Sequence, residues 1–140
     1  MTIKILHAAD IHIKLEKNKV PYDWQKNRFK LFFSKMLELE KSHDITVLAG
    51  DIFDGFPTID ETTLFEEYLT KVTIPTIIIP GNHEATAKGK SFLESYIYNR
   101  AVNNDNVKFY VTNDRFQFKG YWIQLFPYTE MQMDNFINYK

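Results

Sequence analysis

Three short apolar segments rich in isoleucine and valine recur along the first 80 residues, and each is followed by a loop and then by a pattern with helical periodicity. They are Ile3–Ala8, Ile45–Ala49 and Thr76–Ile79. Continuous apolar runs of this length are typical of strands that are buried on both faces of a parallel sheet. The alternation of such strands with helices predicts an α/β fold with right-handed crossovers.

Apolar residues spaced three and four apart predict the helices. The first covers about Asp23–Lys41 and the second covers about Ile59–Val72. Thr58 and Glu61 have the spacing of a capping box at the start of the second helix. A third helix is predicted to begin at Ser91, and the apolar stripes of all three are interpreted as core or interface packing.

The pattern changes after residue 100, where short alternating segments replace the continuous apolar runs. Strands are predicted at Val107–Val111, Arg115–Phe118 and Tyr121–Phe126. The Lys119–Gly120 pair between the last two predicts an antiparallel hairpin. A further helical pattern starts at Met131 without a stop signal, so we expect the chain to be truncated.

Composition narrows the class of protein. The chain has 140 residues, a net charge of −1, 44% hydrophobic and 25% charged residues, which together predict one globular domain. It has no cysteine, which excludes disulfide scaffolds, thiolate metal sites and cysteine nucleophiles. No run approaches the ~20 apolar residues of a membrane span, and no signal peptide is recognisable. We therefore expect a cytoplasmic protein with no membrane partner.

Each of the three predicted parallel strands ends in a cluster of ligand-type residues, namely Asp10–His12, Gly50–Asp54 and Gly81–Glu84. Ligands bind outside the carboxyl ends of the strands in an open α/β sheet, so these clusters are expected to meet in one crevice. Carboxylate, imidazole and amide oxygen are ligands for manganese, iron, zinc or magnesium. Asp51, central in order, is the natural bridge between two ions.

Each cluster by itself has a plainer interpretation. An Asp-x-His pair is common by chance, a Gly-Asp pair can cap a helix, and a Gly-Asn-His-Glu segment can be an ordinary turn. The three in order, each directly after a strand, favour a metal site. His7 lies within a strand and His43 at a helix end, and both are interpreted as structural.

A basic stretch follows the first cluster. Lys14, Lys17 and Lys19 come directly after the Asp10–His12 loop and are predicted to line the mouth of the crevice. Lysines there can contact a phosphate backbone without reading its sequence, which predicts a DNA-binding surface. The plainer alternative is a solvated, charged helix face.

The order of these motifs resembles the calcineurin-like metallophosphoesterases, and within them most closely the SbcD-type nuclease subunit of recombination and repair complexes, including its phage versions. The resemblance implies a metallophosphoesterase-type β-sandwich flanked by helices, with a parallel sheet followed by a short antiparallel hairpin. It covers nearly all of residues 1–140, but only the N-terminal part of the family's single nuclease domain.

The resemblance also implies roles for the matching residues and a pair of divalent ions, manganese in the first place, with magnesium, iron or zinc as alternatives. The implied ligands are Asp10 and His12 for one ion, Asp51 as the bridge and Asn82 for the other. His83 would be the catalytic histidine, with Asp54 orienting it. The implied activity is that of a metal-dependent DNA exo/endonuclease that hydrolyses phosphodiester bonds by a two-metal mechanism.

One departure from the family pattern qualifies this expectation. The family supplies three further metal-binding histidines from later motifs, whereas no histidine follows His83 here. We therefore expect the isolated chain to bind manganese weakly and to have little or no nuclease activity. In the full-length protein, the resemblance implies a homodimer and an SbcC-type coiled-coil ATPase as partner.

Two alternatives to a nuclease remain open. Another metallophosphoesterase, such as a protein or small-molecule phosphatase, would suit Gly81–Glu84, although Asp54-Gly55 lacks the arginine expected of protein phosphatases. A truncated, non-catalytic module that binds DNA or a partner is the other alternative.

Overall fold

The computed structural model describes residues 2–87, 90–91, 93 and 102–128. Its elements follow the chain in the order β1 (Ile5–Ala8), α1 (Tyr22–Glu40), β2 (Ile45–Ala49), α2 (Ile59–Lys71), β3 (Thr76–Ile79), a 3₁₀ turn (Asn82–Glu84), β4 (Ala85–Ala87), β5 (Lys90–Ser91), β6 (Val107–Phe109), β7 (Asp114–Phe118) and β8 (Tyr121–Leu125). Among the described residues, no helix is long and apolar enough to cross a membrane.

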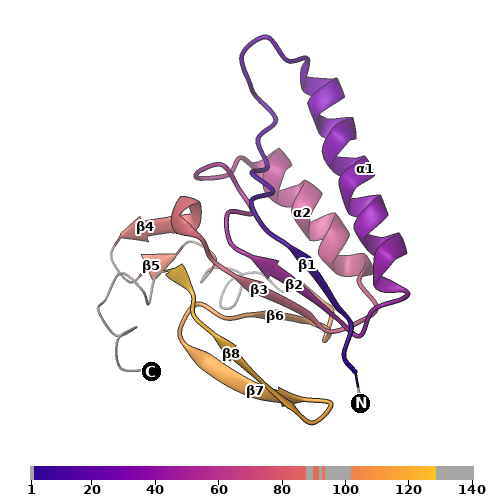
Figure 1. The fold of residues 1–140 in the computed structure, drawn as a ribbon. Coiled ribbons are helices and arrows are strands. Elements are labelled where there is room, and N and C mark those ends of the chain that lie inside the picture. Colours follow the sequence, from indigo (N-terminus) through magenta and orange to yellow (C-terminus); the bar gives the residue numbers. More distant parts are fainter. Residues whose placement is uncertain (1, 88–89, 92, 94–101, 129–140) are drawn as a thin grey trace.

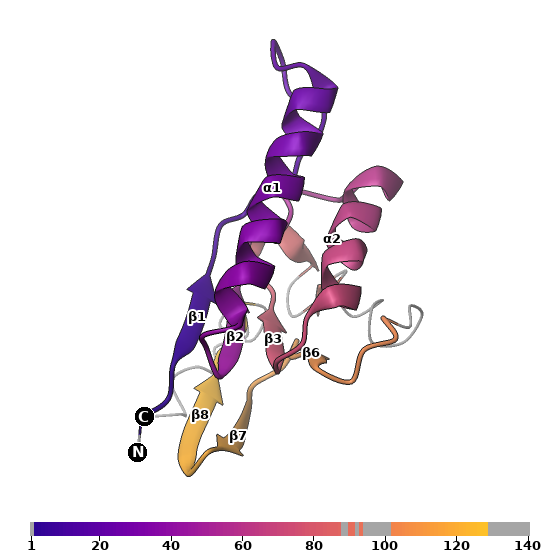
Figure 2. The same cartoon turned by 90° about the vertical axis from the view of Figure 1, so that its right-hand side faces the viewer.

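Four strands form a parallel sheet in the order β1-β2-β3-β6. Because neighbouring strands point the same way, β1, β2 and β3 all end at the same edge of the sheet. Helices α1 and α2 both lie on one side of this sheet, and the antiparallel β7–β8 hairpin lies on the other (Figures 1 and 2). The result is a helix layer, a sheet and a hairpin stacked in that order.

Alternation along the central strands supplies a core on each face of the sheet. Leu48 and Ile78 join the larger cluster beneath the helices, which includes Phe29, Phe33 and Phe65. Side chains on the opposite face of the same strands point toward the hairpin, where Ile45 and Ile77 pack with Leu125. The central strands β2 and β3 thus bury residues on both faces, as their continuous apolar sequence predicts. Strand β1 lies at the edge of the sheet and is at most half-buried, with Ile5 exposed, so the prediction of burial on both faces is wrong for this strand.

The α/β architecture predicted from the sequence is confirmed. Helix α1 is shifted by one residue at each end from the expected Asp23–Lys41, and α2 ends one residue early. The hairpin turns at Lys119–Gly120, where both residues have positive φ, as a tight two-residue turn requires.

One expectation after β3 is wrong, and another is not tested by the described residues. Ser91, the predicted start of the third helix, lies instead in β5, which pairs with β4. The remainder of that predicted helix falls largely outside the described residues, as does the helical pattern from Met131 onward.

Candidate metal centre

The loops that follow β1 and β2 continue side by side beyond the sheet. The Asp10 nitrogen donates to the Gly50 carbonyl over 3.1 Å, and the His12 nitrogen donates to the Asp51 carbonyl over 2.9 Å. A parallel bridge between Ile13 and Phe53 extends this pairing. The backbone itself therefore brings the first two predicted clusters to one place.

The backbone is bent out of the ordinary regions at the candidate ligands. Asp10, His12 and Asp51 have φ values of 54°, 51° and 51°. Left-handed conformations in residues other than glycine are uncommon and cost about 1–3 kcal/mol each, and they concentrate at functional sites. These backbone conformations direct the side chains of Asp10, His12 and Asp51 toward a shared pocket.

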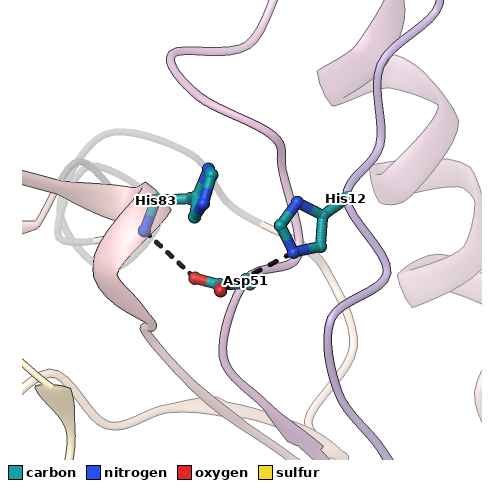
Figure 3. Close-up of side chains that lie close together, drawn as sticks. All are labelled: His12, Asp51 and His83. Atoms are coloured by element: carbon teal, nitrogen blue, oxygen red, sulfur yellow. Dashed lines mark hydrogen bonds and ion pairs between the residues drawn. The ribbon is translucent and has the colours of Figure 1, made fainter.

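His12 has its two ring nitrogens in different surroundings. Nδ1 lies 2.9 Å from Oδ1 of Asp54. Nε2 lies 3.6 Å from Asp51 Oδ2 (Figure 3). The same nitrogen lies 3.8 Å from Asp10 Oδ1. A carboxylate on Nδ1 fixes the ring of a metal-binding histidine and leaves the lone pair of Nε2 for the ion.

Asp51 lies at the centre of the group. Its Oδ1 accepts a hydrogen bond from the His83 backbone nitrogen over 3.0 Å. The side-chain amide of Asn82 lies against the same carboxylate, with one terminal atom 3.0 Å from each carboxylate oxygen. The NH₂ group of Asn82 donates to both of these oxygens, so Asn82 is held directly against Asp51.

His83 faces this pocket from the 3₁₀ turn after β3 (Figure 3). Its Nδ1 donates to the backbone carbonyl of Asp54 over 2.7 Å, and its ring meets that of His12 edge to face, with centroids 4.6 Å apart. The bond to the Asp54 carbonyl raises the pKa of His83, and the nearby carboxylates of Asp51 and Asp54 raise it further. Both effects favour the protonated form of the His83 ring.

Asp54 contacts both histidines, but by different groups. Its backbone carbonyl holds His83, whereas its carboxylate holds His12. The orientation of His83 by Asp54, expected from the sequence, therefore runs through the main chain. The bond to His12 is the main cause that lowers the pKa of Asp54, and Lys14 Nζ, 3.3 Å from Oδ2, lowers it as well.

Glu84 is a residue of this site to which sequence reasoning gave no role. It is fully buried, and its Oε1 accepts hydrogen bonds from the backbone nitrogens of Ile52 (2.9 Å) and Gly81 (3.4 Å). It thereby ties the loop after β2 to the loop after β3. Burial raises the pKa of Glu84 to about 7. Its place at the end of the Gly81–Glu84 motif was the available signal.

The structure brings the predicted ligands Asp10, His12, Asp51 and Asn82 together with His83. Three of them, namely His12, Asp51 and His83, offer atoms that lie within 4.8 Å of one another. Imidazole nitrogens with carboxylate and amide oxygens form a donor set that suits manganese, iron or zinc. The residues present therefore fit the divalent ions that the resemblance implies.

The three predicted DNA-binding lysines are not equivalent. Lys14 is paired with Asp54 at the edge of the pocket. Lys17 and Lys19 are exposed and belong to a turn in the loop that rises beyond the start of α1 (Figure 1). The structure thus places only one of the three beside the candidate ligands by a direct contact.

Comparison with known proteins gives a family and several relatives. Residues 3–135 match the family model for calcineurin-like phosphoesterases. The chain is 37% identical over 97 residues to a probable exonuclease subunit 1 of Escherichia phage T5, a match that covers 67% of this chain and 30% of that protein.

Two other relatives differ in their named activity. The DNA double-strand break repair protein Mre11 of Archaeoglobus fulgidus is 32% identical over 92 residues, covering 61% of this chain and 20% of that protein. A probable cyclic nucleotide phosphodiesterase of Coxiella burnetii is 29% identical over 97 residues, covering 69% of this chain and 38% of that protein.

The chain spans between a fifth and two fifths of the length of these relatives. The match to the family model, in contrast, runs over nearly the whole chain and includes all three motif clusters. The parallel sheet, the hairpin and the shared position of the clusters agree with that match. The chain belongs to the calcineurin-like phosphoesterase family.

Proposed function

We propose that this chain forms the metal-binding N-terminal part of an SbcD-type DNA nuclease that hydrolyses phosphodiester bonds with two divalent ions. The observation that carries the proposal is the convergence of donors from three loops, around Asp10, Asp51 and Asn82, at one edge of the sheet. Support for DNA as substrate comes from the relatives, two of which are named as an exonuclease subunit and a DNA repair protein.

Asp10 and His12 would hold one ion, Asn82 the other, and Asp51 both. When bound, two such ions, manganese in the first place, supply the positive charge that stabilises a phosphodiester under attack. Each ion takes four to six ligands, so the donors of the described residues amount to about half of a complete pair of sites. Little or no nuclease activity and weak metal binding are therefore expected of this chain alone.

His83 is suited to act on the substrate. Its Nδ1 is engaged with the carbonyl of Asp54, so its Nε2 is the nitrogen that can contact a phosphate oxygen or give a proton to the leaving oxygen. The raised pKa of His83 favours the protonated ring that this role needs.

DNA would reach this pocket along the loop that carries Lys17 and Lys19. Both lysines are exposed, and their contacts with phosphates would give affinity that falls with salt concentration. A homodimer and an SbcC-type coiled-coil ATPase are proposed as partners of the full-length protein, acting on DNA in the cytoplasm. The word "subunit" in the name of the phage relative supports a multi-chain assembly.

The experiment compares substrates under single-turnover conditions, with protein in excess and manganese present. Linear duplex DNA, bis-p-nitrophenyl phosphate and cyclic AMP are offered in parallel to the wild type and to Asp51→Asn. We expect little manganese-dependent cleavage of DNA by this chain, detectable at most with protein in excess, and none with Asp51→Asn, since this substitution removes one of the two charged oxygens of the bridge.

Hydrolysis of cyclic AMP or of the small diester without cleavage of DNA would contradict the nuclease and favour a phosphodiesterase, as the Coxiella relative is named. DNA binding without hydrolysis of any substrate would instead favour a non-catalytic module.

A further inference from the structure

A chain of three contacts links Lys14 to the candidate metal pocket. Lys14 Nζ lies 3.3 Å from Asp54 Oδ2. The other oxygen of the same carboxylate lies 2.9 Å from His12 Nδ1, and the opposite nitrogen of that ring lies 3.6 Å from Asp51. The ammonium group of Lys14 is thus connected to the candidate ligand His12 through the carboxylate of Asp54.

The main chain around Lys14 is fixed on both sides. Ile13 and Leu15 are each 1% exposed, so the segment is anchored in the core beneath α2. Four hydrogen bonds hold it: Ile13 N to Ile52 O (2.8 Å), Asp54 N to Ile13 O (3.3 Å), Leu15 N to Glu61 Oε1 (3.0 Å) and Gln25 Nε2 to Lys14 O (3.0 Å). Lys14 therefore extends from an anchored backbone that is paired directly with the segment carrying Asp54.

Lys17 and Lys19 lack such anchoring. Their turn is closed by one hydrogen bond, from Val20 N to Lys17 O, and Lys19 has a φ of 64°. Both side chains are exposed. The three lysines that the sequence groups together are therefore of two kinds, one anchored beside the pocket and two on a projecting turn.

The contact of Lys14 has a consequence for His12. A half-exposed carboxylate can rotate and offer either oxygen to any donor. Because the Lys14 ammonium group lies at Oδ2 of Asp54, Oδ1 is the oxygen that faces His12 Nδ1. A carboxylate oxygen can only accept a hydrogen bond, so Nδ1 must carry the proton. The tautomer of a histidine is set by the hydrogen bond of the nitrogen that does not bind the ion. Nε2, which faces Asp51 and Asp10, is then the nitrogen that can offer its lone pair to an ion.

We propose that Lys14 is a positioning residue, which through Asp54 keeps His12 in the tautomer and orientation that present Nε2 to the metal pocket. This inference rests on the proposed function for its purpose, and it separates Lys14 from the DNA contacts assigned to Lys17 and Lys19. Because the Lys14–Asp54 pair is half-exposed, its loss should weaken metal affinity by only about two- to fivefold.

The test measures the tautomer of the His12 ring in the metal-free protein by long-range ¹H–¹⁵N NMR. It measures the affinity for manganese by calorimetry. The variants are Lys14→Met, which keeps the aliphatic stem, Lys14→Arg, which keeps the charge, and Lys17→Met as the matched control. We expect Lys14→Met to reduce the Nδ1-protonated tautomer of His12 and to weaken manganese binding about two- to fivefold. Lys14→Arg should restore both, and Lys17→Met should change neither.

A His12 tautomer in Lys14→Met that equals that of the wild type would overturn the proposal. The NMR readout needs neither a metal nor DNA, so this result is distinguishable from a failure of the nuclease function. If the wild type hydrolyses cyclic AMP and not DNA while Lys14→Met shifts the tautomer, the proposed function fails and the positioning role stands.

Discussion

Gly81 shows how closely the two central loops approach each other. A Cβ atom at this position would lie 2.3 Å from Asp51 Oδ1 and 2.5 Å from the Asp51 backbone nitrogen. Both atoms belong to the residue that is central to the candidate metal pocket, and the backbone nitrogen cannot move aside alone. Only glycine therefore allows the loop after β3 to lie against Asp51.

Replacement of Gly81 by alanine should push Asp51 out of the pocket. We expect Gly81→Ala to lower the free energy of unfolding by about 1–3 kcal/mol and to reduce manganese affinity. Gly55→Ala is the matched control, since a Cβ there meets no atom within 4 Å. Urea unfolding and calorimetry of both variants check this, and equal stability of the two would show that the loops are not packed as described.

The buried carboxyl group of Glu84 should make stability depend on pH. Its pKa in the folded state, about 7, lies above its ordinary value of 4.5. The folded state therefore binds the proton more tightly, and this group's contribution to stability is present at low pH and is lost as the pH rises toward 7. The desolvation of the buried carboxyl group is the physical cause.

We expect Glu84→Gln to remove this pH dependence, because the amide stays neutral and its oxygen still accepts from Ile52. Between about pH 5 and pH 7.5, the free energy of unfolding of the wild type should fall relative to that of Glu84→Gln, by an amount on the order of 2–3 kcal/mol. Urea unfolding with a chelator present measures it. Parallel pH profiles for the two proteins would refute the assignment.

At the residue scale, the sequence predicts which side chains meet but not how they bond. That Asp10, Asp51 and Asn82 share a pocket follows from the rule for the carboxyl ends of parallel strands. Asp54 makes two different hydrogen bonds, through its carboxylate to His12 and through its backbone carbonyl to His83. These partners depend on the conformations of the loops, which no sequence pattern predicts.

At the scale of elements, Glu61 joins the start of α2 to the segment before α1. Its Oε2 accepts from the Thr58 nitrogen, while the Thr58 hydroxyl accepts from the Glu61 nitrogen, which completes the capping box. Its Oε1 accepts from the Leu15 nitrogen. The cap that fixes α2 thus also fixes the segment from which Lys14 extends.

Removal of the threonine half of this cap should destabilise the protein measurably. We expect Thr58→Ala to lower the free energy of unfolding by about 1 kcal/mol, because one backbone donor at the start of the helix loses its partner. Thr63→Ala, at an exposed position within α2, should leave stability unchanged or slightly higher. Thermal or urea unfolding of the pair decides, and equal losses would argue against a role for the cap.

Elements with a regular spacing of apolar residues were predictable from the sequence, whereas the pairing of very short strands was not. Helices α1 and α2 and the β7–β8 hairpin are within a residue or two of their expected bounds. Ser91 was expected to begin a helix, since it has a glutamate three residues later, but it pairs in β5 with β4. That ladder has only two or three residues on each strand, which is too short to leave a periodic signal.

At the scale of the whole molecule, the two cores hold the sheet from both faces. The helices cover one face through Leu48 and Ile78, and the hairpin covers the other through Ile45, Ile77 and Leu125. The neighbouring strands β1, β2 and β3 are thereby fixed in register, so their ends can carry strained loops at one edge of the sheet. The continuous apolar strands of the sequence predict this two-sided burial.

The central claim is that this edge of the sheet holds divalent metal. The most direct measurement is an anomalous difference map from a crystal of the protein soaked with manganese. We predict a peak bounded by Asp51, His12 and Asn82, and no such peak in crystals of Asp51→Asn. A map with no peak in this pocket, or with manganese bound only elsewhere on the chain, would contradict it.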